Sequence, residues 1–217
     1  GMSRNIYHGG RCDDLFEALK TIKAETPKSD ITLIGFSLGG NIVLKLLGDL
    51  GSLGGRFLKQ VIAVSPPVDL AKSADLLHSA ANGMYEKYFC KIIRKEIHYI
   101  HKKFKELPPV RIPKDLTLRA FDEIYTVPRF NFGSVDEYYH RCSSKHTIEH
   151  ISIPCKILLS EDDPIVSATS LDQQKLPSHI GLFKTKRGGH MGYLGNPSHP
   201  RGFYWLDSVL EDWIFEK

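Results

Sequence analysis

The sequence lacks paired cysteines, long hydrophobic runs and a strong excess of either charge. The cysteines are Cys12, Cys90, Cys142 and Cys155. No two of them form a C-x-x-C pair, which argues against a disulfide framework or a thiolate zinc site and favours a reducing, cytoplasmic setting. The apolar runs are far shorter than the ~20 residues of a membrane span, and residues 1–20 contain no secretory signal. We therefore expect a soluble cytoplasmic protein.

The charge balance also excludes some classes of partner. The 29 Lys and Arg residues exceed the 25 Asp and Glu residues by a small margin, which gives a net charge of +4. Such a margin does not indicate a nucleic-acid-binding protein. With 217 residues, 41% of them hydrophobic, the chain can bury one substantial core. We predict a single domain over residues 1–217.

The hydrophobic pattern alternates between helices and strands. Short apolar runs rich in β-branched residues predict strands, and apolar residues at helical spacing predict helices. The predicted strands are residues 31–36, 60–65, 155–160 and 180–185, and the predicted helices are 12–25, 41–50, 167–175 and 203–215. The second strand is apolar on both faces, as buried parallel strands are. We predict an α/β fold with a mostly parallel sheet and helices on both faces.

Residues 66–152 contain no comparable strand pattern and are too numerous for a bare loop. We predict that they form a helical cap inserted into the domain. Its clearest element is a helix over 84–107, with an apolar stripe and a surface rich in Lys and Arg. We favour a cap helix whose apolar face packs on the core. The alternative is weak docking of this helix on an anionic lipid surface.

A G-x-S-x-G pattern follows the first predicted strand. It comprises Gly35, Ser37 and Gly39, is extended by Gly40, and precedes an amphipathic helix. This is the pattern of a nucleophile elbow, in which a sharp turn makes the residues two before and two after the serine crowd each other, so that both are glycine. The backbone N–H of Leu38 would then face the reacting carbonyl as an oxyanion donor. The pattern predicts Ser37 as a nucleophile.

A serine nucleophile needs a histidine base and a carboxylate that orients it. Asp162 and Asp163 follow the third predicted strand, and His190 follows the fourth. The order Ser, Asp, His is that of the α/β-hydrolases, and both sites lie beyond the carboxyl ends of parallel strands, where such sheets bind ligands. We favour Asp163 as the triad acid, because it directly precedes Pro-Ile-Val, and keep Asp162 as the alternative.

Several separated blocks resemble the YheT-like group of α/β-hydrolases, which are relatives of the abhydrolase-domain lipases and esterases. The blocks are residues 4–10 together with 13–15, then 35–45, 65–70, 117–122, 136–139, 161–164 and 188–192. The resemblance extends from about Arg4 to the end of the chain. It implies an α/β-hydrolase fold with Ser37, Asp163 and His190 as the catalytic triad.

The chain departs from that family at its beginning. Family members usually carry several strands before the elbow, and an H-G-type loop that supplies another oxyanion N–H. Only about 30 residues precede the elbow here, so we interpret the chain as an N-terminally shortened hydrolase. The strand over 31–36 should then form an exposed apolar edge, which predicts weak esterase activity and a homodimer whose contact includes this strand or its flanking helices.

These observations predict a serine hydrolase that acts on a small-molecule or lipid carboxylic ester. The reaction requires no cofactor, and the histidines show no spacing that indicates a metal site. The alternative is a catalytically weak or inactive hydrolase remnant that serves as a binding or interaction module.

Overall fold

The computed structural model describes residues 3–79, 83–198 and 202–215. Its centre is a parallel sheet with the strand order β1-β2-β3-β4. The strands are β1 (Thr32–Phe36), β2 (Gln60–Val64), β3 (Cys155–Ser160) and β4 (Ile180–Thr185). All four predicted strands are thus confirmed. In the described chain β1 pairs only with β2, so the expectation that the elbow strand forms an edge is also confirmed.

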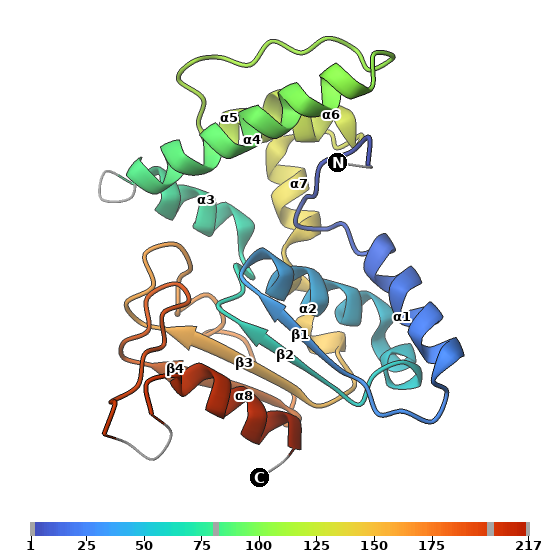
Figure 1. The fold of residues 1–217 in the computed structure, drawn as a ribbon, viewed down its shortest axis with the longest axis vertical. Helices are drawn as coiled ribbons and strands as arrows, with labels where there is room; N and C mark the ends of the chain where they lie inside the picture. Colours follow the sequence, from blue (N-terminus) through green and yellow to red (C-terminus); the bar gives the residue numbers. More distant parts are fainter. Residues whose placement is uncertain (1–2, 80–82, 199–201, 216–217) are drawn as a thin grey trace.

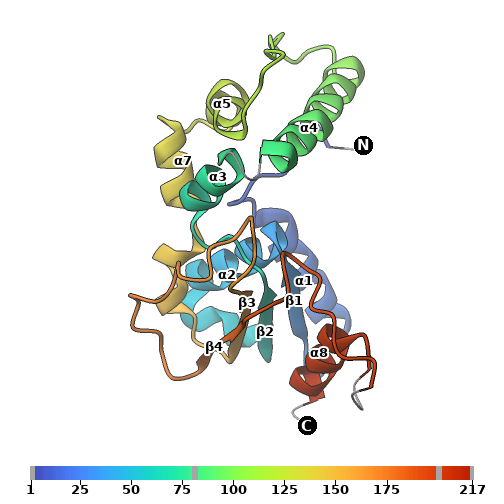
Figure 2. The ribbon, with the colours of Figure 1, turned by 90° about the vertical axis from the view of Figure 1, so that its left-hand side faces the viewer.

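Helices cover both faces of the sheet (Figures 1 and 2). α1 (Asp13–Glu25) and α2 (Leu38–Leu50) pack on one face, and α8 (Trp205–Phe215) packs on the other. The sequence of β2 does not alternate between apolar and polar residues, because the strand is buried on both faces. Val61 and Ala63 face α2, whereas Ile62 and Val64 face the α8 side, and none of the four has any exposed area. The predicted α/β architecture is confirmed.

The chain between β2 and β3 forms helices and turns in its described part. These helices are α3 (Leu70–His78), α4 (Gly83–Lys103), α5 (Leu118–Phe121), α6 (Val127–Arg129) and α7 (Val135–Cys142), with a π-helix at Asp122–Thr126. Short 3₁₀ helices lie in the same segment at Ser144–His146 and Ile148–His150, and another lies before β2 at Gly51–Arg56. Figures 1 and 2 show α3 to α7 above the end of the sheet at which the strands terminate.

One buried amide connects this helical segment to the sheet domain. Asn41 in α2 donates hydrogen bonds to the carbonyl oxygens of Gly9, at 2.8 Å, and Cys142, at 2.9 Å. Its own oxygen accepts the N–H of Ser144, and the residue has no exposed area. The N-terminal segment, the end of α7 and the elbow helix therefore meet at a single side chain whose hydrogen bonds are satisfied inside the protein.

The prediction of a helix over 167–175 is wrong. Residues 168–173 form successive turns, with backbone bonds three residues apart, such as Ser170 N–H to Ser167 C=O. The Ser167 hydroxyl accepts the backbone N–H of Thr169, which offers this segment a local alternative to helical bonding. Leu171 is nevertheless buried, so the apolar pattern reports core packing correctly.

The predicted cap helix is present as α4, but it ends at Lys103 rather than Leu107. Its C-terminal half follows the favoured interpretation, with Ile97 and Ile100 buried in an apolar cluster with α5 and its neighbours. Its N-terminal half does not, because Tyr88 is 61% exposed and Ile92 43% exposed. Glu86 and Cys90 in this half are buried, and Glu86 bonds to His78 and to the Leu118 N–H, so only part of the apolar stripe is exposed.

Candidate active site

Ser37 lies on a strained turn between β1 and α2. Its backbone has φ 48° and ψ −125°, a conformation that non-glycine residues rarely adopt, and its N–H donates to the carbonyl of Val64 on β2. A Cβ at Gly35 would lie 2.5 Å from the carbonyl oxygen of Gly39, so the turn excludes any side chain there. The sequence prediction of a nucleophile elbow is consistent with this geometry.

The crowding is not symmetrical, which corrects one expectation. A Cβ built at Gly39 has no heavy atom within 4 Å, so steric exclusion does not explain that glycine. At Gly40, in contrast, a Cβ would lie 3.0 Å from the ring of Pro66 and 3.2 Å from the oxygen of Gly35. The close approach of α2 to the sheet therefore depends on Gly35 and Gly40.

The three predicted triad residues form one hydrogen-bonded chain. Ser37 Oγ lies 2.8 Å from Nε2 of His190, and Nδ1 of His190 lies 2.9 Å from Oδ2 of Asp163. The Asp163 side chain is 1% exposed and the His190 side chain 20% exposed. The other carboxylate oxygen of Asp163 accepts the backbone N–H groups of Ile165 and Val166, which fixes its orientation. An arrangement of this kind is chemically suited to a nucleophile, a base and an orienting acid.

The neighbouring Asp162 has a different role in the structure. It accepts the Ser160 hydroxyl and the backbone N–H groups of Gly188 and Gly189. These hydrogen bonds, that of Ser160 first, lower the pKa of Asp162 below its ordinary value. Asp162 therefore ties the loop that carries the acid to the loop that carries His190, while Asp163 contacts the imidazole itself.

A second contact supports the loop that carries His190. The hydroxyl of Tyr193 lies 2.7 Å from the buried Ser65 hydroxyl at the end of β2. A Cβ at Gly188 would lie 2.7 Å from the Tyr193 ring, so the loop can close over this tyrosine only with glycine there. The sequence analysis assigned no role to Ser65 or Tyr193.

Leu38 is the first residue of α2 and directly follows Ser37, so its N–H has no acceptor within the helix. This placement agrees with its predicted role as an oxyanion donor.

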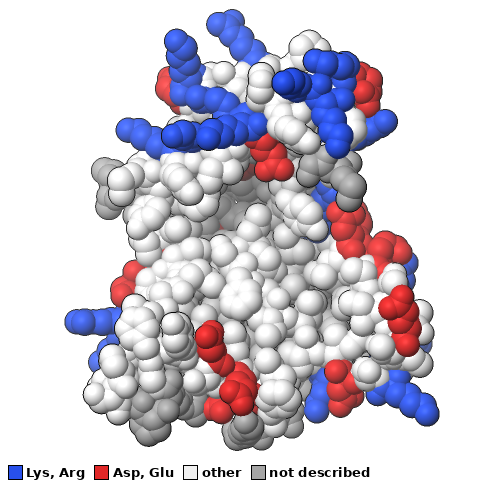
Figure 3. Space-filling model, in the orientation of Figure 1, with Lys and Arg blue, Asp and Glu red and all other residues white. Residues whose placement is uncertain are grey.

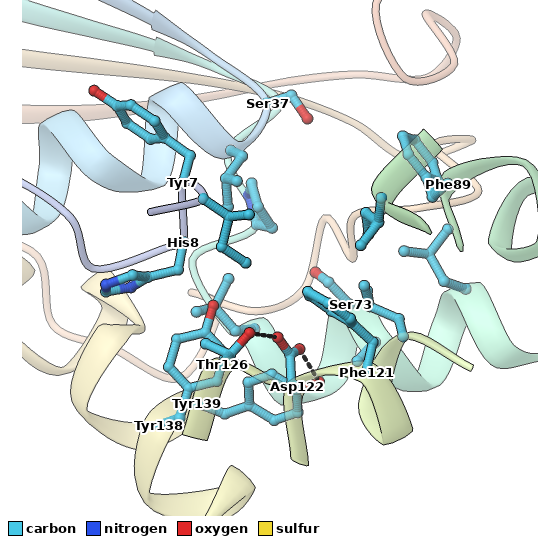
Figure 4. A pocket seen from close by; sticks show the side chains of 18 of the residues that line it. Tyr7, His8, Ser37, Ser73, Phe89, Phe121, Asp122, Thr126, Tyr138 and Tyr139 are labelled. Carbon is cyan, nitrogen blue, oxygen red and sulfur yellow. Dashed lines mark hydrogen bonds between the residues drawn. The ribbon is translucent and has the colours of Figure 1, made fainter. Parts of the chain in front are cut away.

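A cavity of about 600 Å³ opens beside Ser37 and His190. It lies between the sheet domain and the helical segment, and its lining is mostly apolar (Figure 4). The N-terminal segment contributes Tyr7 and His8, and the helical segment contributes Phe89, Asp122 and Tyr139, among others. Figure 3 shows the hollow below the Lys-rich and Arg-rich surface of α4, with acidic atoms at its upper edge and mostly uncharged residues elsewhere around it.

The far wall of this cavity carries a polar group that sequence reasoning missed. Asp122, which is 6% exposed, accepts hydrogen bonds from Tyr139 Oη at 2.8 Å and Thr126 Oγ1 at 2.7 Å. Asp122 and Tyr139 lie in two of the blocks that resemble the YheT-like group. Their place in these blocks was the only indication in the sequence analysis that the two residues matter, and it did not predict that α7 would bring Tyr139 into contact with Asp122.

The described residues contain no cluster of three or more His, Cys, Asp or Glu side chains that could hold a metal ion. The four cysteines are free and buried. Among the described helices, none is both long and apolar enough to cross a membrane.

Comparison with known proteins identifies the family. Residues 10–185 match the Hydrolase_4 family, described as "Serine aminopeptidase, S33". The chain is 28% identical over 209 residues to a monoacylglycerol lipase of Saccharomyces cerevisiae, with 91% of this chain and 46% of that protein aligned. It is 24% identical over 214 residues to the putative esterase YheT of Escherichia coli, with 96% and 62% aligned. The chain thus spans about half to three fifths of the length of these relatives.

Solved structures share the fold. The Pyrococcus furiosus esterase Pf2001 superposes with a TM-score of 0.51 at 18% identity, covering 98% of this chain and 62% of the esterase. A 2,6-dihydroxy-pseudo-oxynicotine hydrolase gives a TM-score of 0.56 at 16% identity, covering 96% and 46%. The predicted resemblance to YheT-like α/β-hydrolases is therefore confirmed at the level of family and fold.

Proposed function

Because the chain belongs to the Hydrolase_4 family of α/β-hydrolases, we propose that it is a serine hydrolase that cleaves carboxylic esters through Ser37, His190 and Asp163. The hydrogen-bonded chain from Ser37 Oγ through the imidazole to Asp163 carries this proposal. The relatives named as esterases and lipases support ester hydrolysis as the reaction class.

The geometry suits acyl transfer in two steps. Ser37 Oγ attacks the ester carbonyl while His190 Nε2 accepts its proton, and Asp163 stabilises the resulting imidazolium. The Leu38 N–H stabilises the negative oxygen of the tetrahedral intermediate. The intermediate collapses as His190 protonates the leaving alcohol, which leaves an acyl group on Ser37. Water, deprotonated by His190, then attacks the acyl-enzyme and releases the carboxylic acid.

A fluorophosphonate probe tests this proposal, since it labels only an activated serine. We expect wild-type protein to be labelled, Ser37→Ala not to be labelled, and His190→Ala to be labelled far more slowly. Turnover of p-nitrophenyl esters of increasing chain length then measures which acyl groups the cavity admits. A wild-type protein that melts cooperatively yet resists labelling would contradict the proposal and favour a binding module without catalytic activity.

The free cysteines bear on the cellular setting of the protein. Four free, buried cysteines are expected of a protein that folds in a reducing compartment, which supports our proposal of a cytoplasmic location.

A further inference from the structure

The cavity beside Ser37 is negatively charged although the protein is not. The chain carries an excess of Lys and Arg and a net charge of +4. Among the described residues that line the cavity, however, none is Lys or Arg, whereas two are carboxylates, Asp122 and Glu96. Burial lowers the pKa of His8, another lining residue, to about 4, so that its imidazole is neutral at pH 7. The cavity therefore offers negative charge without a matching cation.

Asp122 is the stronger of the two acceptors, because it is buried while Glu96 is exposed. Tyr139 and Thr126 donate one hydrogen bond each to it, and both donors are neutral. A carboxylate has about four acceptor positions, so these two bonds leave part of its capacity unused. Burial raises the pKa of Asp122 to about 6, although the hydrogen bonds from Thr126 and Tyr139 act to lower it. An uncompensated carboxylate in an apolar cavity is costly to retain unless a ligand uses it.

The backbone at Asp122 is itself unusual. Residues 122–126 form a single π-helical turn in which the Val127 N–H reaches back five residues to the Asp122 carbonyl. Pro128, which follows, has no N–H to donate to a carbonyl of the preceding turn. Such turns occur most often at functional sites, and this one places the side chains of Asp122 and Thr126 side by side at the cavity wall.

Aromatic side chains also line the cavity. Phe121, Tyr138 and Tyr139 lie next to Asp122, whereas Tyr7 and Phe89 line the cavity apart from it (Figure 4). Aromatic faces attract cations by their quadrupoles, and this attraction increases where water is excluded. A buried carboxylate among aromatic rings is therefore suited to an organic cation, and less suited to an anionic or purely aliphatic group.

We propose that the ester substrate carries a cationic ammonium group, which Asp122 and the surrounding aromatic side chains bind while the ester lies at Ser37. The position of the ester rests on the proposed function. The cation site rests on Asp122, the absence of Lys and Arg from the described cavity lining, and the aromatic residues. A neutral hydroxyl group in place of the cation would use the same acceptor but would leave the negative charge uncompensated.

Two matched pairs of esters test this proposal. Butyrylcholine and 3,3-dimethylbutyl butyrate have the same shape but differ in charge on the alcohol side. The p-nitrophenyl esters of 6-(trimethylammonio)hexanoic acid and 7,7-dimethyloctanoic acid differ in the same way on the acyl side. We expect at least one cationic ester to bind Ser37→Ala, which cannot turn it over, at least tenfold more tightly than its neutral isostere in calorimetry.

The variant Asp122→Asn preserves the size of the side chain and one acceptor oxygen. In the Ser37→Ala background it should abolish the preference for the cationic ester and leave binding of the neutral ester unchanged within twofold. Glu96→Gln is the matched control, because Glu96 lines the same cavity but is exposed, and it should weaken binding of the cationic ester by less than threefold.

The outcomes separate this proposal from the proposed function. Equal binding of charged and neutral esters in both pairs would overturn the cation site, as would a preference that survives in Asp122→Asn. If Asp122→Asn does not fold, the comparison of isosteres in Ser37→Ala alone decides. Cation-selective binding by a protein that fluorophosphonate does not label would retain the cation site and reject the esterase.

Discussion

The hydroxyl groups of Ser65 and Tyr193 lie 2.7 Å apart beneath the loop that carries His190, and both residues have positive φ angles, of 47° and 39°. Non-glycine residues in this conformation store strain that the surrounding structure must offset. The contact therefore joins two strained segments, one at the end of β2 and one three residues after His190.

Loss of this contact should disturb catalysis through the position of His190. We expect Tyr193→Phe to lower kcat about tenfold with little change in KM, and to lower the free energy of unfolding by about 1 to 3 kcal/mol, because the Ser65 hydroxyl loses its partner. Steady-state kinetics and chemical denaturation measure the two effects. Ser65→Ala in the same background should cost little more, since the interaction is already absent. Additive losses would show that the two hydroxyls act independently.

The two neighbouring aspartates should respond differently to the same substitution. Asp163→Asn removes the charge that stabilises the imidazolium and alters the tautomer of His190, so kcat should fall by about 10⁴. Asp162→Asn should cost far less, about tenfold, because an amide oxygen still accepts the Gly188 and Gly189 N–H groups. Rates with a p-nitrophenyl ester rank the two variants, and the opposite order would identify Asp162 as the triad acid.

The buried carboxylate of Asp122 should make the protein less stable as the pH rises. Its pKa is raised from 3.8 to about 6 in the folded state, so the folded state binds more protons between these values and stability falls across this window. Above pH 6 the wild type bears the full free-energy cost of burying the charged carboxylate, whereas Asp122→Asn buries no charge. The variant should therefore gain about 2 kcal/mol relative to the wild type between pH 4 and pH 7.

Thermal unfolding of both proteins across this pH range measures that gain. The comparison cancels groups that both share, such as His8, whose lowered pKa has the opposite effect on stability. A difference in Tm that stays constant with pH would show that Asp122 is not ionised in this window.

Contact of α4 with an anionic membrane surface stays a prediction, to which the structure adds an exposed apolar half of the helix. Met84, Tyr88 and Ile92 are exposed there, and Lys87, Lys91 and Lys95 are exposed along the same helix. We expect binding to vesicles with 30% phosphatidylserine, and a loss of at least tenfold when these three lysines are changed to glutamine.

The matched control changes Lys20, Lys23 and Lys28, in and after α1, to glutamine, which removes the same charge far from α4. It should leave vesicle binding within threefold. Equal losses in both triple variants would show that net charge, and not α4, determines the contact.

The homodimer also stays a prediction. β1 is an edge strand in the described chain, is apolar, and carries neither proline nor lysine. The Ile31 carbonyl and the Ser37 N–H both bond to the β2 segment, so the alternation along the strand turns the backbone groups of Thr32 and Ile34 outward. Thr32→Pro removes one outward N–H at the first strand residue. We expect light scattering to show a dimer that this variant dissociates, and a monodisperse wild-type monomer would contradict it.

The sequence predicted the sheet and the triad for related physical reasons. Buried parallel strands are continuous apolar runs, and residues directly after them, such as Ser37, Asp163 and His190, must meet at one end of the sheet. No such rule predicts which residues meet at the far wall of the cavity. Asp122 and Tyr139 lie 17 residues apart, and they meet only because α7 packs against the preceding π-helix in one particular way.

The incorrect prediction of a helix over 167–175 has a local cause. Its apolar spacing is helical, yet serine and threonine hydroxyls compete for the backbone bonds, and periodicity does not register that competition. The uncovered half of α4 has a tertiary cause. An amphipathic pattern shows that a face is apolar, but not whether another element of the same chain reaches it.

The amide of Asn41 determines which parts of the pocket wall can give way to an incoming substrate. Because it binds the backbone of the N-terminal segment and of α7 directly behind the elbow, these two walls stay in register with Ser37. The N-terminal part of α4 is tied by Glu86 to His78 and to the N–H of Leu118, both of which belong to the helical segment and not to the sheet domain. The entrance should therefore widen by rotation of the outer part of the helical segment about Asn41, so that a bulky substrate displaces the roof of the cavity and leaves the residues around Ser37 in place.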